Sequence, residues 1–195
     1  MSEQVPIGIT SDGSSAWVAD SEAIALSRID LTSGSASDPI ALEAASFPAE
    51  VATGGGSVWV VDRDNGRLIK VDADDPSTQK DFPLGSNPKG IVVADGSVWV
   101  ANTDDHNVVR FAMDGTEQDE IRVGGEPRLL AYGFGRVWVA NGNGSVQAID
   151  PAAGSSVQSV DVPGSPEGVV AGSSRVWVTT GEGDQVVRID PGAAG

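Results

Sequence analysis

The sequence has no cysteine, a single histidine and one tyrosine. A disulfide framework and a cysteine nucleophile are therefore excluded, and any site that needs histidine would have to use His106. Basic residues are also scarce, because 12 lysines and arginines stand against 28 acidic residues and give a formal net charge of −16. Such a chain would be repelled by nucleic acids and anionic membranes, so neither is an expected partner.

Long apolar runs are missing as well. No stretch approaches the length of a membrane span, and Met1-Ser2-Glu3-Gln4 has neither the basic nor the apolar region of a signal peptide. We therefore expect a soluble chain. Its compartment stays open, because a cysteine-free chain is compatible with both cytoplasmic and extracytoplasmic locations.

The sequence is instead dominated by a repeat. Gly96-Ser97-Val98-Trp99-Val100-Ala101-Asn102 has four close copies, and the five copies contain every tryptophan: Trp17, Trp59, Trp99, Trp138 and Trp177. These tryptophans lie 42, 40, 39 and 39 residues apart, and each follows a proline by eleven residues. A constant period near 40 predicts a single domain, 1–195, with repeats at about 6–47, 48–87, 88–126, 127–165 and 166–195.

Each repeat has the pattern of short strands joined by tight turns. A proline-led segment, a glycine-bearing turn and the tryptophan segment predict an antiparallel hairpin, and a third β-rich segment such as 68–72 follows a polar loop. Weaker fourth strands are expected at 40–42, 81–84, 121–123 and 157–162. The pattern predicts an all-β fold, a β-propeller of five four-stranded blades.

The fifth repeat has no candidate for a fourth strand, so this blade is expected to be incomplete or the chain to be a piece of a larger propeller. We expect the five blades to close into a ring. The tryptophans should pack between neighbouring blades, where large aromatic side chains bury most area. Basic residues recur in the third strand at Arg28, Lys70, Arg110 and Arg188 and are expected to pair with acids near the end of the second strand.

The pattern Pro-x-Gly-Ile/Val, Gly-Ser-Val-Trp-Val-Ala-Asn/Asp and Arg-Ile-Asp resembles the YVTN/NHL-type bacterial β-propeller repeats, including virginiamycin B lyase-like proteins. The resemblance covers essentially the whole chain and implies the propeller fold. The lyase chemistry that it implies needs histidine and acidic residues around a divalent metal, but His106 has no second histidine to match it. The lyase residues are therefore absent, and we predict no catalytic residue.

In a propeller, the loops before the first strand and after the second strand of each blade share one face. Acidic residues gather in these loops, so we expect an acidic face at the mouth of the channel. The recurring Asp20, Asp62, Asn102 and Asn141 are interpreted as partners of the turn backbone. The candidate ligand-binding residues are those that do not recur: Asp104, Asp105, His106, Glu182 and Asp184, together with Lys89, Arg128 and Glu167, which follow their prolines.

No cofactor or metal is predicted. Asp62-Arg63-Asp64-Asn65-Gly66 resembles part of a calcium loop but lacks the distal glutamate, so a divalent cation has no ligand motif to support it. We predict a non-catalytic ligand-binding or sensor module for a small cationic or polar ligand, or for a basic peptide or protein. Two alternatives stay open: a metal-dependent propeller lyase or hydrolase, and a structural or self-assembling scaffold, engineered or truncated, that associates through its unfinished fifth blade.

Overall fold

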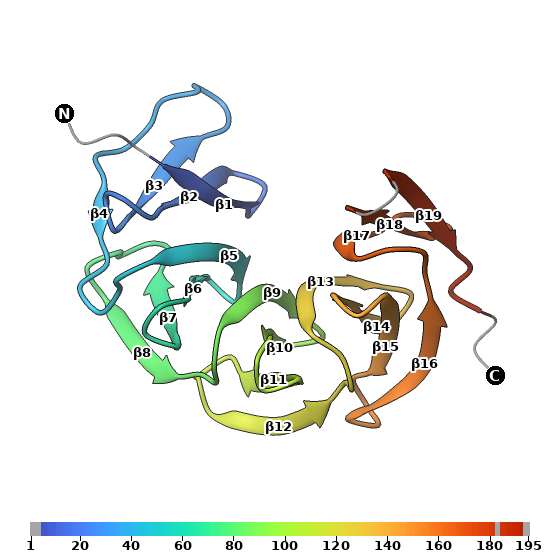
Figure 1. Ribbon diagram of the computed structural model, residues 1–195. Helices are drawn as coiled ribbons and strands as arrows, with labels where there is room; N and C mark the ends of the chain where they lie inside the picture. Colours follow the sequence, from blue (N-terminus) through green and yellow to red (C-terminus); the bar gives the residue numbers. More distant parts are fainter. Residues whose placement is uncertain (1–4, 182–183, 193–195) are drawn as a thin grey trace.

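The computed structural model describes residues 5–181 and 184–192, and these residues form strands and turns without a helix. The strands make five antiparallel sheets, each built from consecutive segments of the chain. The sheets stand side by side around a common centre, as the blades of a β-propeller (Figure 1). The predicted fold class is confirmed.

The blades are numbered in chain order. Blade 1 contains β1 (Pro6–Ser11), β2 (Ser15–Asp20), β3 (Ala25–Asp30) and β4 (Ile40–Ala41), and blade 2 contains β5 (Pro48–Gly54), β6 (Ser57–Asp62), β7 (Arg67–Asp72) and β8 (Gln79–Pro83). Blade 3 contains β9 (Pro88–Ala94), β10 (Ser97–Asn102), β11 (Asn107–Ala112) and β12 (Glu117–Arg122). Blade 4 contains β13 (Pro127–Gly133), β14 (Arg136–Asn141), β15 (Ser145–Asp150) and β16 (Ser155–Asp161), and blade 5 contains β17 (Pro166–Ala171), β18 (Val176–Thr180) and β19 (Gln185–Ile189).

Within each blade the strands pair in chain order, with the first strand nearest the centre (Figure 1). The predicted hairpin is confirmed in blade 1, where Trp17 lies opposite Thr10 of β1 and Arg28 of β3. The outer strands differ more from the prediction. β12 begins at Glu117, four residues before the start expected at residue 121. The sequence pattern did not reveal these four residues, because they are polar and show no alternation. Among the described residues, blade 5 has three strands, as expected for an incomplete blade.

Four tryptophans fill the interfaces between blades. Trp17, Trp59, Trp99 and Trp138 are fully buried. Each packs against the two valines that flank the tryptophan of the next blade, as Trp59 does against Val98 and Val100 of β10. An indole of about 200 Å² contributes on the order of 5 kcal/mol by leaving water, before the entropy cost of ordering. The predicted packing role is confirmed for these four residues.

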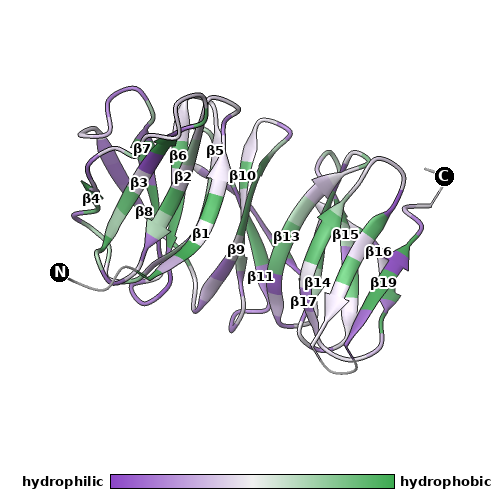
Figure 2. Cartoon of the chain, turned by 90° about the horizontal axis from the view of Figure 1, so that it is seen from above, coloured by the Kyte–Doolittle hydropathy of each residue, from purple (hydrophilic) through white to green (hydrophobic). Residues whose placement is uncertain are grey.

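The arc of blades is open in this structure, contrary to the expected closed ring. The inner strands contact each other in the order β1, β5, β9, β13 and β17, and blades 1 and 5 stand at the two ends of the arc (Figure 1). Figure 2 looks into the opening and shows hydrophobic segments along the strands of both end blades. Trp177 of blade 5 faces this opening and is 41% exposed, because no other blade of the described residues packs against it.

The recurring basic residues of the third strand have different partners from those expected. The Arg28 guanidinium lies over the Trp17 ring, 5.1 Å from its centroid, and its Nε donates to Ser15 Oγ at 2.8 Å. Its Nη1 donates to the carbonyl oxygen of Ala73 in the next blade. The expected pairing with acids at the end of the second strand is therefore wrong for Arg28, which crosses to the neighbouring blade instead.

Candidate functional site

One face of the propeller carries both sets of loops named in the sequence prediction. The strand register places them together, because the first residue of each inner strand lies opposite the last residue of the second strand. The five pairs are Pro6 with Asp20, Pro48 with Asp62, Pro88 with Asn102, Pro127 with Asn141, and Pro166 with Thr180. We call this side the loop face.

All five inner strands contribute to a cavity of about 310 Å³ on the loop face, which we call the mouth pocket. It is lined by Ile7, Ala49, Glu50, Arg63, Lys89, Arg128, Leu129 and Glu167. Three of these side chains are basic and two are acidic. The pocket is therefore richer in basic groups than the chain as a whole, which carries a net charge of −16.

Two glycines leave the space that charged side chains occupy in this pocket. A Cβ on Gly142 would lie 2.6 Å from Nε and Nη2 of Arg128, and a Cβ on Gly181 would overlap the carboxylate of Glu167. These glycines directly follow β14 and β18, at the repeat position that Arg63 occupies after β6. With Lys89 from blade 3, blades 2 to 5 each place at least one charged side chain in the mouth pocket.

Two of the basic groups keep unused hydrogen-bonding capacity. Arg128 donates from Nη1 to Ser165 Oγ at 3.1 Å and approaches Glu126 at 3.5 Å, but its buried Nε has no partner. Lys89 has no hydrogen-bond or ion-pair partner among the described residues. The two side chains come from the neighbouring inner strands β9 and β13. Both positive charges line the pocket and would attract an anionic group there, although the Arg128 Nε atom itself is buried away from it.

Glu50 and Arg63 form the other charged side of the pocket. Burial raises the pKa of Glu50, and the nearby Arg63 charge opposes this shift. The Arg63 guanidinium lies over the Phe47 ring, 4.4 Å from its centroid. Arg63 is absent from the sequence-based candidates, because no motif or repeated position marks it.

The predicted acidic residues of blade 3 are bound to neighbouring loops. Asp104 Oδ1 accepts from Asn87 Nδ2 at 3.0 Å, and Asp105 Oδ2 accepts from the backbone N of Ser86 at 2.7 Å. His106 Nδ1 donates to the carbonyl oxygen of Gly125 at 2.6 Å. These bonds hold the loops before β9 and β13, so the three side chains serve the loop structure in addition to any ligand role.

His106 and the predicted Asp184 share a backbone conformation. Both have positive φ, 55° and 47°, in the turn after the second strand. Blades 2 and 4 have Gly66 and Gly144 in this turn, also with positive φ, and blade 1 has Ile24. The turn therefore requires a positive φ at this position in every blade, a conformation that favours glycine. The predicted Glu182 lies outside the described residues.

The recurring polar residues at the ends of the second strands hold the loops, as interpreted from the sequence. Asp20 Oδ1 accepts from the backbone N of Ala23 at 2.9 Å, and Asp62 Oδ1 accepts from that of Phe47 at 2.8 Å. Asn102 donates to Asn107 Oδ1 at 3.0 Å. The two aspartates therefore bind the loop backbone as interpreted, whereas the buried Oδ1 atoms of Asn102 and Asn141 have no hydrogen-bond partner among the described residues. The loop face is therefore less available to a cation than its acidic composition suggests.

The structure brings Lys89, Arg128 and Glu167 of the predicted set together in the mouth pocket, and leaves Asp104, Asp105, His106 and Asp184 in turns outside its lining. Within residues 5–181 and 184–192, no group of three or more His, Asp or Glu side chains is placed to hold a metal ion. The same residues contain no helix long and apolar enough to cross a membrane.

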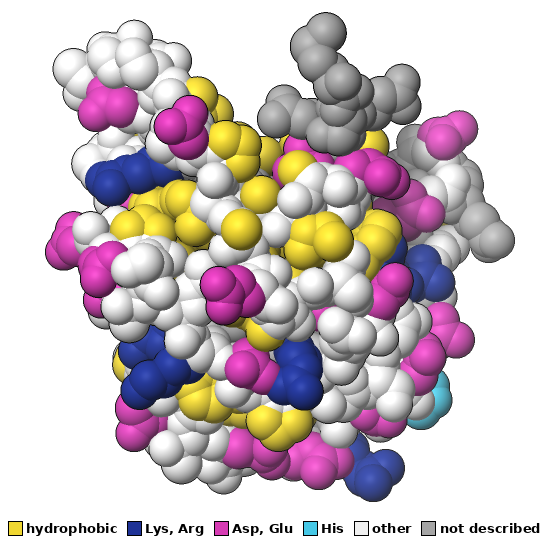
Figure 3. Space-filling view, turned by 90° about the vertical axis from the view of Figure 1, so that its left-hand side faces the viewer, with side chains coloured by type: hydrophobic (Ala, Val, Ile, Leu, Met, Phe, Trp, Pro, Cys, Tyr) yellow, Lys and Arg dark blue, Asp and Glu magenta, His cyan; other side chains and the backbone are white. Residues whose placement is uncertain are grey.

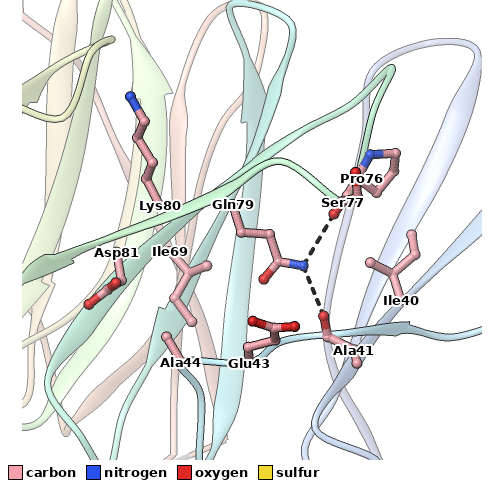
Figure 4. A pocket seen from close by; sticks show the side chains of 10 residues that line it. All are labelled: Ile40, Ala41, Glu43, Ala44, Ile69, Pro76, Ser77, Gln79, Lys80 and Asp81. Carbon is pink, nitrogen blue, oxygen red and sulfur yellow. Dashed lines mark hydrogen bonds between the residues drawn. The ribbon is translucent and has the colours of Figure 1, made fainter.

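A larger groove of about 550 Å³ lies between the outer strands of blades 1 and 2. Gln79 reaches across it and donates to the carbonyl oxygens of Ala41 at 2.9 Å and Pro76 at 3.2 Å (Figure 4). The two-residue β4 leaves this side of blade 2 uncovered. Figure 3, which looks onto this side, shows acidic and basic side chains scattered among apolar and uncharged ones. The Gln79 amide that crosses the groove is already bound to backbone carbonyl oxygens, so the mouth pocket is the stronger candidate site.

No family model and no curated protein matches the sequence. Solved structures do match. A chain of a nidogen/laminin complex is 18% identical with a TM-score of 0.82, over 96% of this chain and 76% of that chain. A streptogramin B lyase is 16% identical with a TM-score of 0.77, over 97% and 70%. Virginiamycin B lyase from Staphylococcus aureus is 18% identical with a TM-score of 0.76, over 97% and 71%.

These proteins include a partner in a protein complex and two enzymes, so they share a scaffold and no single activity. At such low identity the likeness concerns the fold alone. The predicted resemblance to propeller repeats is thereby confirmed at the level of structure. The chain is a β-propeller with five blades, the last of them three-stranded over the described residues.

Proposed function

We propose that this protein is a non-catalytic ligand-binding module, and that its mouth pocket takes a small polar ligand with an anionic group. The observation that carries the proposal is the pair Lys89 and Arg128, two positive charges that line a 310 Å³ cavity, of which Lys89 has no hydrogen-bond or ion-pair partner among the described residues. Buried or half-buried donors without partners are costly in a folded protein. An anionic ligand would satisfy both.

The acidic side of the pocket adds selectivity to this proposal. Glu167 is exposed at the rim and Glu50 is half-buried, so the ligand would meet hydrogen-bond acceptors opposite the basic pair. A molecule with an anionic group at one end and a hydroxyl or amino group at the other fits this distribution of charge. A small apolar or purely cationic molecule would leave Lys89 without a partner and the charge of Arg128 without a counter-ion in the pocket.

Calorimetric titration tests the proposal with defined probes: malonate, phosphate, glycine, glucose and spermidine. We expect the anionic or zwitterionic probes to bind, and Lys89→Ala to weaken that binding at least tenfold, because a charge-assisted hydrogen bond contributes roughly 1.5–3 kcal/mol. Lys80→Ala is the matched control, since Lys80 lines the outer groove and is distant from the pocket. Equal effects of the two variants, or no binding of any anionic probe, would refute the proposal.

A cationic ligand on the loop face is the competing proposal, motivated by the net charge of −16. It predicts that spermidine binds and that Asp104→Asn and Asp184→Asn weaken its binding. Among the described residues the Asp104 side chain hydrogen-bonds only to Asn87, so the variant should stay folded. Binding of spermidine that depends on these aspartates, with no binding of malonate, would favour the acidic face over the mouth pocket.

A further inference from the structure

Every interface between neighbouring blades is built from the same parts. One blade supplies a tryptophan from its second strand and an aliphatic residue from its third, such as Trp138 and Val146. The next blade supplies a pair of valines and an aliphatic residue from its third strand, here Val176, Val178 and Ile189. The interface therefore has two different halves, and each internal blade carries one half on each side.

A basic side chain crosses each of the four interfaces in the same direction. Arg28 donates to the carbonyl oxygen of Ala73 at 3.3 Å, Lys70 to that of Met113 at 2.8 Å, and Arg110 to that of Pro151 at 3.0 Å. In blade 4 the third strand has Ala148 at this position, and Arg136 of β14 instead donates to the carbonyl oxygen of Pro191 at 3.0 Å. The same bond is thus made from another strand when the usual residue is absent.

The two ends of the arc present the two unmatched halves. Blade 5 exposes Val170, Trp177, Val186 and Arg188, which we call the donor end, and Val186 is 65% exposed. Blade 1 presents Ile9, Val18, Ile29 and Leu31, which we call the acceptor end, and Ile9 is 68% exposed. Leu31 occupies the repeat position of Ala73, Met113, Pro151 and Pro191, whose carbonyl oxygens accept the crossing bond.

We propose that the donor end of one chain packs against the acceptor end of a second copy of this chain. Trp177 and Val186 then lie against Ile9, Val18 and Ile29 of the second copy, and Arg188 donates to its Leu31 carbonyl oxygen. The contact follows the plan of an interface that the fold already forms four times, except that blade 1 has Ala16 where the other blades have the first valine of the pair. It also covers apolar side chains that would otherwise stay in water.

The asymmetry of the two ends determines the geometry of association. Two donor ends placed together would bring Arg188 against Arg188 with no carbonyl acceptor between them. The contact is therefore head-to-tail, and it leaves one donor end and one acceptor end free at the limits of the assembly unless a ring closes. Closure within one chain would require the four ordered interfaces to change, because they hold blades 1 and 5 apart (Figure 1).

The absence of cysteine allows a direct test by engineered disulfides. At the interface of blades 1 and 2 the side chains of Thr10 and Thr53 meet, with their Oγ1 atoms 3.5 Å apart, so cysteines at these positions would lie side by side. The corresponding residues of the proposed contact are Val170 at the donor end and Ser11 at the acceptor end. Val170→Cys and Ser11→Cys chains are mixed and oxidised, and Thr10→Cys with Thr53→Cys in one chain is the positive control.

We expect the mixture to form a covalent heterodimer. Its yield should be at least ten times that of the homodimer that either variant forms when it is oxidised alone. A chain that carries both Val170→Cys and Ser11→Cys is also oxidised at micromolar concentration. This experiment distinguishes contact between two chains from closure within one chain. Cross-linked dimers and larger species support the proposal, whereas a cross-linked monomer would show closure within one chain and overturn it. Absence of any cross-link, with the positive control fully oxidised, would also overturn it.

Sedimentation of the unmodified protein supplies a second measurement. We expect association that depends on concentration, with a dissociation constant raised at least tenfold by Val186→Asp. Val157→Asp is the matched control, because Val157 lies on β16 outside both ends and is 48% exposed. Acrylamide quenching reports on Trp177, since the other four tryptophans are buried. A strict monomer, with quenching that is independent of concentration, would contradict the proposed contact.

Discussion

Arg136 in β14 donates a hydrogen bond from Nη1 to the carbonyl oxygen of Pro191, 3.0 Å away, and so joins blade 4 to blade 5. In blades 1 and 3 the equivalent bond comes from the third strand, where Arg28 and Arg110 also hydrogen-bond a serine of the second strand. Blade 4 has exchanged the two positions, with arginine on the second strand and Ala148 on the third. The bond between blades is preserved although the sequence pattern is not.

The tryptophans should differ in their contribution to stability. We expect Trp99→Ala to lower the free energy of unfolding by about 3–5 kcal/mol, because it leaves a cavity between blades 3 and 4. Trp177→Ala should cost less than half as much at low protein concentration, since Trp177 is 41% exposed. Urea unfolding of both variants measures the difference. Equal losses would mean that Trp177 is as well covered in solution as Trp99.

Ile24 is a site where substitution should stabilise the protein. It has a φ of 50° in the turn between β2 and β3, a conformation that is strained for a β-branched residue. We expect Ile24→Gly to raise the free energy of unfolding by about 1 kcal/mol, because a left-handed residue other than glycine costs roughly 1–2 kcal/mol. Ile24→Ala separates side-chain loss from backbone relief, and a gain as large as that of glycine would contradict this explanation.

Gly142→Ala should displace Arg128 from its place in the mouth pocket. The new Cβ would lie 2.6 Å from the guanidinium nitrogens, so the hydrogen bond from Nη1 to Ser165 should be lost. We expect a destabilisation of about 1 kcal/mol, the contribution of one hydrogen bond, and at least a tenfold loss in affinity for the anionic probes. Crystallography of the variant shows the arginine directly.

The control for this change is Gly172→Ala. A Cβ at Gly172 has its nearest atom at 3.5 Å, an ordinary contact, and the residue lies in blade 5 away from the pocket lining. We expect no change in probe affinity. An unmoved Arg128 side chain in Gly142→Ala would show that the glycine is not what makes room for it.

Asp12 should make stability depend on acidic pH. Its carboxylate accepts hydrogen bonds from Trp17 Nε1 at 2.9 Å, from Ser14 and from the backbone N of Ser15, and these hold its pKa well below the usual value. The depressed pKa means that the stabilisation is complete above the unfolded pKa of about 4 and is lost as pH falls toward the folded pKa. We therefore expect protonation of Asp12 to lower the free energy of unfolding as the pH falls below about 4.

Urea unfolding at pH 7 and pH 3 tests the role of Asp12. Asp12→Asn should lower stability at pH 7 and show a smaller difference between the two pH values than the unmodified protein. Asp38→Asn is the control, because the Asp38 carboxylate has no hydrogen-bond partner among the described residues. If both variants keep the full pH dependence, Asp12 does not contribute to it.

Much of the fold could be predicted because its signals are local. The proline and tryptophan of each repeat mark a hairpin, and the structure has the first and second strands where this spacing placed them. The outer strand was harder to predict. β12 exposes most of its side chains and needs no hydrophobic alternation, since pairing with β11 is enough to hold it.

The candidate site was only partly accessible to the same reasoning. Lys89, Arg128 and Glu167 stood out because they follow their prolines, and the structure places all three in the mouth pocket. Arg63 had no such marker. The engagement of Asp105 with the Ser86 backbone also depends on a neighbouring loop 19 residues away, which no spacing within the repeat encodes.

The sequence alone determined the blades, because each hairpin is set by turn residues and alternating side chains within about forty positions. Only the tertiary structure decided how the blades are arranged. The angle between sheets depends on how tryptophans, valines and crossing arginines pack together, and small differences accumulated over four interfaces separate a closed ring from an open arc. The same packing decided which charged groups are engaged by loops and which face the mouth pocket.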